Sequence, residues 1–190
     1  MTETPALSSL SPTVAEFVLR WGDMGSQWGV NRSVAQIHAL LFLSDVPLAA
    51  EAIADQLGIA RSNVSNSLKE LVGWKLIRRV PVPGDRRDHF EAETDLWKMA
   101  TRIAQGRKER EIDPAVAALH DIMALSAQDT AISPAVRGRL VAMHEFIGTM
   151  DRWYGQMLSI PPATLMALVR MGSRIASVAK LVTGKKVDDG

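Results

Sequence analysis

The sequence contains no cysteine. Without thiols the chain cannot form a disulfide framework, a thiolate zinc site or a cysteine nucleophile, and it suits a reducing compartment. Aromatic residues are few, at 5%, while the apolar share of 47% and the charged share of 23% are ordinary for a globular protein. A chain of 190 residues can bury a core without cross-links. We expect one compact domain, or one small domain with appended helices.

Signals for export or membrane insertion are also missing. Residues 1–10 are polar and lack the basic start and apolar run of a signal peptide. The long apolar stretch at residues 163–182 carries Arg170, Arg174 and Lys180, which does not fit a membrane span. We therefore expect a cytoplasmic protein that has no membrane partner.

The residue types of common catalytic and metal sites are not grouped along the chain. Histidine is scattered, at His38, His89, His120 and His144. None of the four forms a zinc-ligand pair or lies beside a plausible serine nucleophile, and no glycine-rich phosphate loop follows a strand. We expect no catalytic residues, no metal and no cofactor, so the protein is not predicted to be an enzyme. Tryptophans can cage a quaternary ammonium ion, but Trp21 and Trp28 lie on an apolar stripe, which favours a place in the core.

The positive charge of the chain is concentrated in one segment. The net charge is only +1, which by itself does not favour binding to a phosphate backbone. Between Arg61 and Arg87, however, seven arginines and lysines face only two acids, Glu70 and Asp85. That segment has the local charge expected for a nucleic-acid contact.

Helix start and stop signals punctuate the N-terminal part. Ser11-Pro12 predicts an N-cap followed by a first helix, which Gly29 ends. Ser33 and Gln36 have the spacing of a capping box, so we expect Ser33 to cap the second helix.

The C-terminal part is expected to be helical from Asp95, with a break near Gly106 or at Asp113-Pro114. Ser133-Pro134 predicts the start of another helix, and a last helix is expected over residues 163–182. The inner side of the helix that starts at Ser133-Pro134 is predicted to hold Leu140, Met143, Ile147, Met150, Tyr154 and Met157.

Residues 49–72 predict two short helices joined by a tight turn. Gly58 supplies the positive φ that the turn needs, and Ala54 is small enough for a close approach of the helices. The outer face of the second helix is short-chained, hydrogen-bonding and basic, as a helix in the major groove requires. Its candidate DNA-binding residues are Arg61, Ser62, Asn63, Ser65, Asn66 and Lys69. In isolation such a face is more often merely solvated. The DNA-binding interpretation therefore depends on the segment that follows this helix.

That segment predicts a β-hairpin, with strands over residues 76–81 and 88–93 and a turn at Pro83-Gly84-Asp85. A ribbon that projects after a recognition helix can straddle the phosphate backbone, and its tip can place an arginine in the minor groove. Asp85 beside Arg86 and Arg87 would hold a guanidinium in a fixed direction. These three complete the set of candidate DNA-binding residues. The alternative is a surface hairpin whose charges neutralise one another.

Residues 35–95 resemble the MarR superfamily of winged-helix regulators. The run from Val82 to Glu93 is similar to the GbsR-like branch, and so is Ser62-Asn63-Val64-Ser65 followed by Leu68 and Leu71. Asp85 and Arg87 have the spacing of the superfamily's Asp-x-Arg wing motif. The resemblance implies a recognition helix in the major groove, a wing arginine in the minor groove and terminal helices that build a dimer. Ala60 departs from the pattern, because a polar cap is usual there.

The expected fold is mainly α, a winged helix-turn-helix with a two-stranded β wing, flanked by N- and C-terminal dimerisation helices. Residues 1–30 would form the N-terminal helix of the dimerisation region, 31–94 the DNA-binding domain and 95–190 the C-terminal helical dimerisation region. The expected function is a repressor-type transcriptional regulator that binds a pseudo-palindromic operator in double-stranded DNA as a homodimer.

Several alternatives stay open at this point. A response to a small-molecule effector is a hypothesis only. The helices could belong to a larger monomeric helical domain, and the winged helix could be a protein–protein interaction module that binds no DNA. Some methyltransferases begin with a winged-helix dimerisation domain, so a further alternative is that the chain is a fragment of such an enzyme.

Overall fold

The computed structural model describes residues 10–161, 163–165, 167 and 171. The chain divides into two compact units, Met1–Gly106 and Arg107–Gly190. The helix expected over residues 163–182 and the tail that follows fall almost entirely outside the described residues. Within the described part of the chain, no helix is both long enough and apolar enough to cross a membrane.

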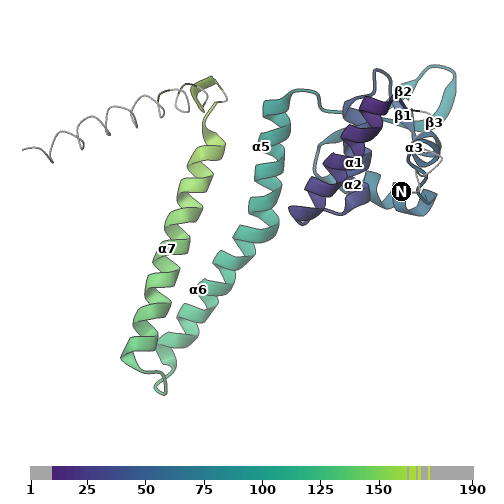
Figure 1. The fold of residues 1–190 in the computed structure, drawn as a ribbon. Helices are drawn as coiled ribbons and strands as arrows, with labels where there is room; N and C mark the ends of the chain where they lie inside the picture. Colours follow the sequence, from purple (N-terminus) through teal and green to yellow (C-terminus); the bar gives the residue numbers. More distant parts are fainter. Residues whose placement is uncertain (1–9, 162, 166, 168–170, 172–190) are drawn as a thin grey trace, which may run out of the picture. The chain divides into compact units, whose positions relative to one another are not determined.

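The first unit holds a compact helical domain with a small sheet (Figure 1). Its elements in chain order are α1 (Pro12–Gln27), α2 (Arg32–Phe42), β1 (Leu48–Ala49), α3 (Ala50–Leu57), α4 (Arg61–Gly73), β2 (Ile77–Val82), β3 (Asp85–Ala92) and α5 (Leu96–Arg107).

The helix starts follow from capping chemistry, with one correction. The Ser11 side chain accepts a hydrogen bond from the Val14 N–H, as its N-cap position predicts. The second helix, however, is capped by Asn31 and not by Ser33, because Asn31 Oδ1 accepts from the Ser33 N–H at 2.9 Å. Asn31 lies just before the helix and its side chain reaches the amide two residues on. Ser33 itself lies inside α2 and is free to contact α4.

The predicted helix-turn-helix is present as α3 and α4. Gly58 ends α3 in the left-handed conformation, with φ of +64°, which costs glycine no Cβ strain. The core of the unit joins both helices to α2 through the apolar residues Ile37, Ile53, Val64 and Leu71, which are all at most 1% exposed. Because α4 turns this apolar side to the core, its opposite side faces solvent.

The wing is an antiparallel hairpin of β2 and β3, as predicted, but the sheet has a third strand. β1 pairs with β3, so the strand order is β1-β3-β2. A strand of two residues has no periodicity that a sequence could reveal. Gly84, with φ of +83°, makes the turn between the paired residues Val82 and Asp85. The register shifts between Val80 and Val82, around Pro81, which cannot donate to a neighbouring strand.

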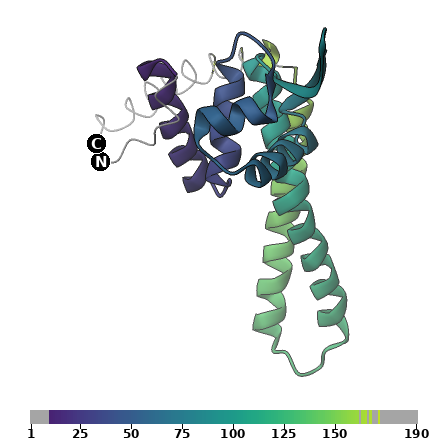
Figure 2. The ribbon, with the colours of Figure 1, turned by 90° about the vertical axis from the view of Figure 1, so that its right-hand side faces the viewer.

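The second unit is a helical hairpin. It comprises the π-helix η2 (Lys108–Ile112), α6 (Asp113–Gln128) and α7 (Pro134–Ser159). Helices α6 and α7 run antiparallel and side by side in both views (Figures 1 and 2). The break expected near Asp113-Pro114 is wrong, because η2 keeps the chain helical there. Lys108 pairs with Asp113 and, at 2.7 Å, with Asp151 of α7, and both hydrogen bonds raise the pKa of Lys108.

The predicted inner side of α7 is only partly correct. Leu140, Ile147 and Tyr154 are half-buried, but Met143 and Met150 are 52% and 42% exposed. The two methionines lie seven residues apart on a different side of the helix. We call this side the outer stripe of α7. Its members are Val136, Met143, Phe146, Met150 and Trp153, all exposed in the single chain.

Candidate nucleic-acid interface

Helix α4 presents most of its candidate residues to solvent. Buried Val64, Leu68 and Leu71 follow one another at helical spacing and hold the helix against the core. The exposed candidates on the other side are Arg61, Ser62, Ser65, Asn66 and Lys69. Within the described residues, the side chains of Arg61, Asn66 and Lys69 make no hydrogen bond or ion pair. Two cations and one amide are therefore available to a partner.

Asn63 differs from the other α4 candidates. It is half-buried, and its Nδ2 donates a hydrogen bond to Ser33 Oγ in α2 at 2.8 Å. This bond ties the first turn of α4 to the first turn of α2. The structure therefore places Asn63 as a link within the domain and not on the exposed face of α4.

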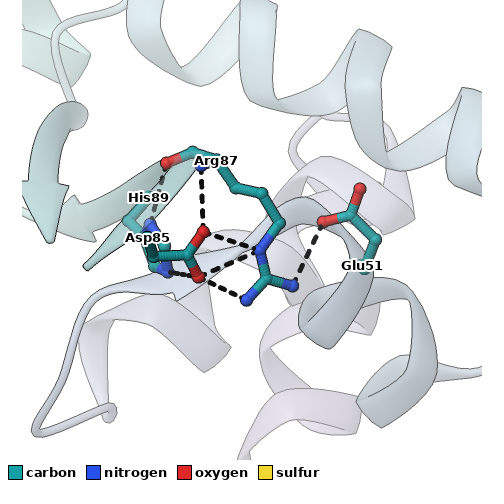
Figure 3. Close-up of polar contacts among 4 residues, drawn as sticks. All are labelled: Glu51, Asp85, Arg87 and His89. Atoms are coloured by element: carbon teal, nitrogen blue, oxygen red, sulfur yellow. Dashed lines mark hydrogen bonds and ion pairs between the residues drawn. The ribbon is translucent and has the colours of Figure 1, made fainter.

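The predicted restraint of a wing guanidinium is present at Arg87 (Figure 3). The Arg87 backbone N–H donates to Asp85 Oδ1 at 3.0 Å, and Arg87 Nε lies 3.0 Å from each carboxylate oxygen. Glu51 of α3 approaches the same guanidinium from the other side, at 4.0 Å. The side-chain and backbone hydrogen bonds from Arg87 hold the pKa of Asp85 well below its usual range, so the carboxylate is charged at neutral pH.

Arg87 does not lie at the tip of the wing. The turn is at Pro83-Gly84, and Arg87 lies further along β3 with its guanidinium beside Glu51. Arg86 is exposed and nearer the tip, and among the described residues its side chain has no hydrogen-bond or ion-pair partner. The two neighbouring arginines therefore differ, one held by carboxylates and one open to solvent.

Sequence reasoning missed His89 as a part of this cluster. The residue is 7% exposed. Its Nδ1 lies 3.0 Å from the Arg87 carbonyl oxygen and its Nε2 lies 3.5 Å from Asp85 Oδ2 (Figure 3). The only signal in the sequence is the alternate spacing of Asp85, Arg87 and His89, which a regular strand places on one side.

A second missed residue is Arg79 of β2. It lies 3.2 Å from an Asp88 oxygen, and its guanidinium is 5.7 Å from the centre of the buried Phe90 ring. Arg79 also lines a groove of about 310 Å³ between α4 and the sheet, together with Ser65, Lys69 and Arg87. The groove brings residues of the predicted recognition helix and of the predicted wing to one place on the first unit.

A model of a known protein family matches the part of the chain that holds α4 and most of the wing. Residues 28–88 match the model of the MarR family. This part of the chain is similar to the MarR family. It spans α2, α3, α4 and most of the wing, and it includes every candidate residue named above.

A curated relative and a solved structure agree with this similarity. The HTH-type transcriptional repressor GbsR of Bacillus subtilis is 24% identical over 97 residues, which are 51% of this chain and 53% of that protein. The chain thus spans about half the length of this curated relative. A solved structure described as a transcriptional regulator is 26% identical, covers 77% of this chain and 96% of its own, and has a TM-score of 0.56.

These findings confirm the resemblance to the MarR superfamily and its GbsR-like branch, and they confirm the winged-helix fold class. The MarR family is one of transcriptional regulators and not of enzymes, which agrees at this level with the expectation from the sequence.

Proposed function

We propose that this protein is a transcriptional repressor that binds a pseudo-palindromic operator in double-stranded DNA as a homodimer. The observation that carries the proposal is the exposed face of α4, where Arg61, Asn66 and Lys69 lack partners among the described residues. Long cations and an amide on one side of a short helix suit the floor and the phosphate edges of a major groove.

The candidate residues take different parts in this contact. Asn66 is placed to read a base edge, since an amide can pair with adenine through two hydrogen bonds. Arg61 and Lys69 neutralise phosphates, while Ser62 and Ser65 are short enough to let the backbone approach. Ala60 gives α4 no side-chain cap, so the first N–H groups of the helix are open to a phosphate.

The wing extends the contact to the neighbouring minor groove. Arg86 is exposed and unpaired among the described residues, and a narrow minor groove attracts such a guanidinium. Arg87 is held by Asp85 and Glu51, which fixes the direction of its charge before DNA arrives. Such preorganisation saves part of the entropy that an ordered side chain loses on binding.

The outer stripe of α7 supports the homodimer. Val136, Met143 and Met150 recur at seven-residue spacing, and Phe146 and Trp153 each follow a methionine by three residues, which is the pattern of a helix that packs against another helix. These side chains are 42–61% exposed in the single chain, and a second copy would bury them. Two-fold pairing would separate the two α4 helices by about 34 Å, one turn of B-DNA. A small-molecule effector would act on such a dimer by changing this separation.

Fluorescence titration tests the proposal, using a duplex that the wild-type protein selects from a random-sequence library. We expect Arg86→Ala and Arg87→Ala each to weaken binding by roughly 1–3 kcal/mol. Arg20→Ala removes the same charge from an exposed site on α1 and is the matched control, which should bind as the wild type does. The logarithm of the binding constant should fall steeply with the logarithm of salt concentration. Failure of the wild type to enrich any duplex would refute the proposal.

A further inference from the structure

We propose that His89 is a positioning residue of the wing, which fixes the Asp85 carboxylate and through it the direction of the Arg87 guanidinium. This inference rests on the proposed DNA-binding function and adds to it the residue that sets the wing arginine. It starts from the location of the imidazole, which is buried inside the sheet and contacts both partners of the Asp85–Arg87 pair (Figure 3).

The fold holds the His89 ring in place. His89 lies on β3, the central strand, where it pairs with Ala49 of β1 on one side and with Val80 of β2 on the other. Its side chain is 8% exposed. An imidazole fixed in this way provides a rigid support for a neighbouring side chain, unlike the exposed residues at the wing tip.

The partners of the ring are both hydrogen-bond acceptors. Nδ1 lies 3.0 Å from the Arg87 carbonyl oxygen, and Nε2 lies 3.5 Å from Asp85 Oδ2. The Arg87 carbonyl oxygen can only accept, and the Asp85 carboxylate is charged at neutral pH because Arg87 holds its pKa low. The two ring nitrogens of His89 thus lie against the backbone of Arg87 and the carboxylate of Asp85, and they restrain the pair from one side.

The contacts form a chain from His89 to the guanidinium. Asp85 accepts hydrogen bonds from the backbone N–H and the side chain of Arg87, and its Oδ2 lies 3.5 Å from His89 Nε2. The charged groups around the ring are Asp85 and Arg87 on β3 and, beyond Arg87, Glu51 on α3. In the described part of the chain His89 makes no ion pair with α2, β1 or β2. The His89 ring therefore acts on the Asp85–Arg87 pair.

A double-mutant cycle in the full-length chain tests the inference, with the duplex selected by the wild-type protein as the probe. His89→Phe keeps a flat ring and removes both ring nitrogens. We expect it to weaken binding about fivefold, the size of one ordinary hydrogen bond. In an Arg87→Ala background the same substitution should change binding by less than about twofold, because the arginine through which His89 acts on DNA is absent. Equal losses in the two backgrounds, or no loss in either, would overturn the inference.

A second variant keeps the test decisive if His89→Phe does not fold. His89→Gln retains an N–H donor that can point toward Asp85. We expect its affinity for the duplex to lie within about twofold of that of the wild type, as rescue by a conservative donor. A larger loss that persists in the Arg87→Ala background would overturn the inference.

The experiments distinguish a failure of the positioning role of His89 from a failure of the proposed DNA-binding function. If the wild type binds DNA and Arg87→Ala weakens binding while His89 variants behave as the wild type does, only the positioning role is wrong. If the wild type selects no duplex, the proposed function is wrong and the positioning role falls with it.

Discussion

His38 is a buried base in an aromatic surrounding. It is 4% exposed, and its ring centre lies 6.4 Å from that of Trp21 and 6.3 Å from that of Phe42. Its Nε2 has no hydrogen-bond partner among the described residues. Burial lowers the pKa of His38 from 6.5 to about 4, because a charged imidazole would lose its hydration. The folded protein therefore favours the neutral form of the His38 imidazole over the charged form.

This burial makes the stability of the first unit depend on pH. Between the unfolded pKa of 6.5 and the folded pKa of about 4, the unfolded chain binds more protons, so the free energy of unfolding falls as pH drops. We expect His38 to account for a loss of about 2 kcal/mol between about pH 7 and 5. His38→Phe should remove this part of the loss. Urea unfolding of both proteins at the two pH values measures it, and an equal loss in the variant would contradict the prediction.

Single residues also show which features of the candidate site the sequence could not predict. Helical spacing correctly predicted that Arg61, Asn66 and Lys69 lie on the exposed side of α4. It could not show that Asn63, at the border of that side, reaches Ser33 thirty positions earlier in the chain. The restraint of Arg87 by Asp85 was predictable because the two residues are two apart. The approach of Glu51 was not, since it depends on how α3 packs against the sheet.

At the level of elements, the contact of α1 with α2 depends on glycine. A Cβ added to Gly25 would lie 2.5 Å from the Cβ of Ala35, a distance that forces one helix to move. The sequence predicted both helices from their caps and stripes, but not this close approach. The two-residue strand β1 was missed for a related reason, because it depends on pairing with β3. The choice of Asn31 over Ser33 as a cap is a local contact, and it was missed because both residue types are good caps.

Gly25→Ala should therefore destabilise the first unit. Extra volume between closely packed elements costs typically about 1–3 kcal/mol. Gly73→Ala in α4 is the matched control, because a Cβ there meets nothing within 4 Å, and alanine is favoured over glycine in a helix by about 0.5–1 kcal/mol. We expect a loss of stability for the first variant and none for the second, as measured by urea unfolding. Equal effects of the two substitutions would show that the α1–α2 contact is not close-packed.

At the scale of the whole molecule, the second unit leaves one apolar side without cover among the described residues. Its two long helices have only one residue that counts as buried, Ser126, and the outer stripe of α7 exposes Phe146 to 61%. The sequence indicated the helices and their apolar residues. It could not show which residues meet α6 and which are left over, because both sets recur at helical spacing. An apolar side left without cover in one copy favours association of two.

Phe146→Glu tests whether the outer stripe joins two copies. The side chain is exposed in the single chain, so the substitution should leave the fold intact, whereas a buried, unpaired carboxylate at a subunit contact is costly. We expect a dimer for the wild type and for the apolar control Phe146→Leu, and a monomer for Phe146→Glu, by sedimentation velocity. The monomer should also bind the selected duplex more weakly, because the DNA-binding domains of two copies no longer act together on one duplex. A dimeric Phe146→Glu would place the subunit contact elsewhere, and a monomer with undiminished affinity would mean that one domain is enough for DNA binding.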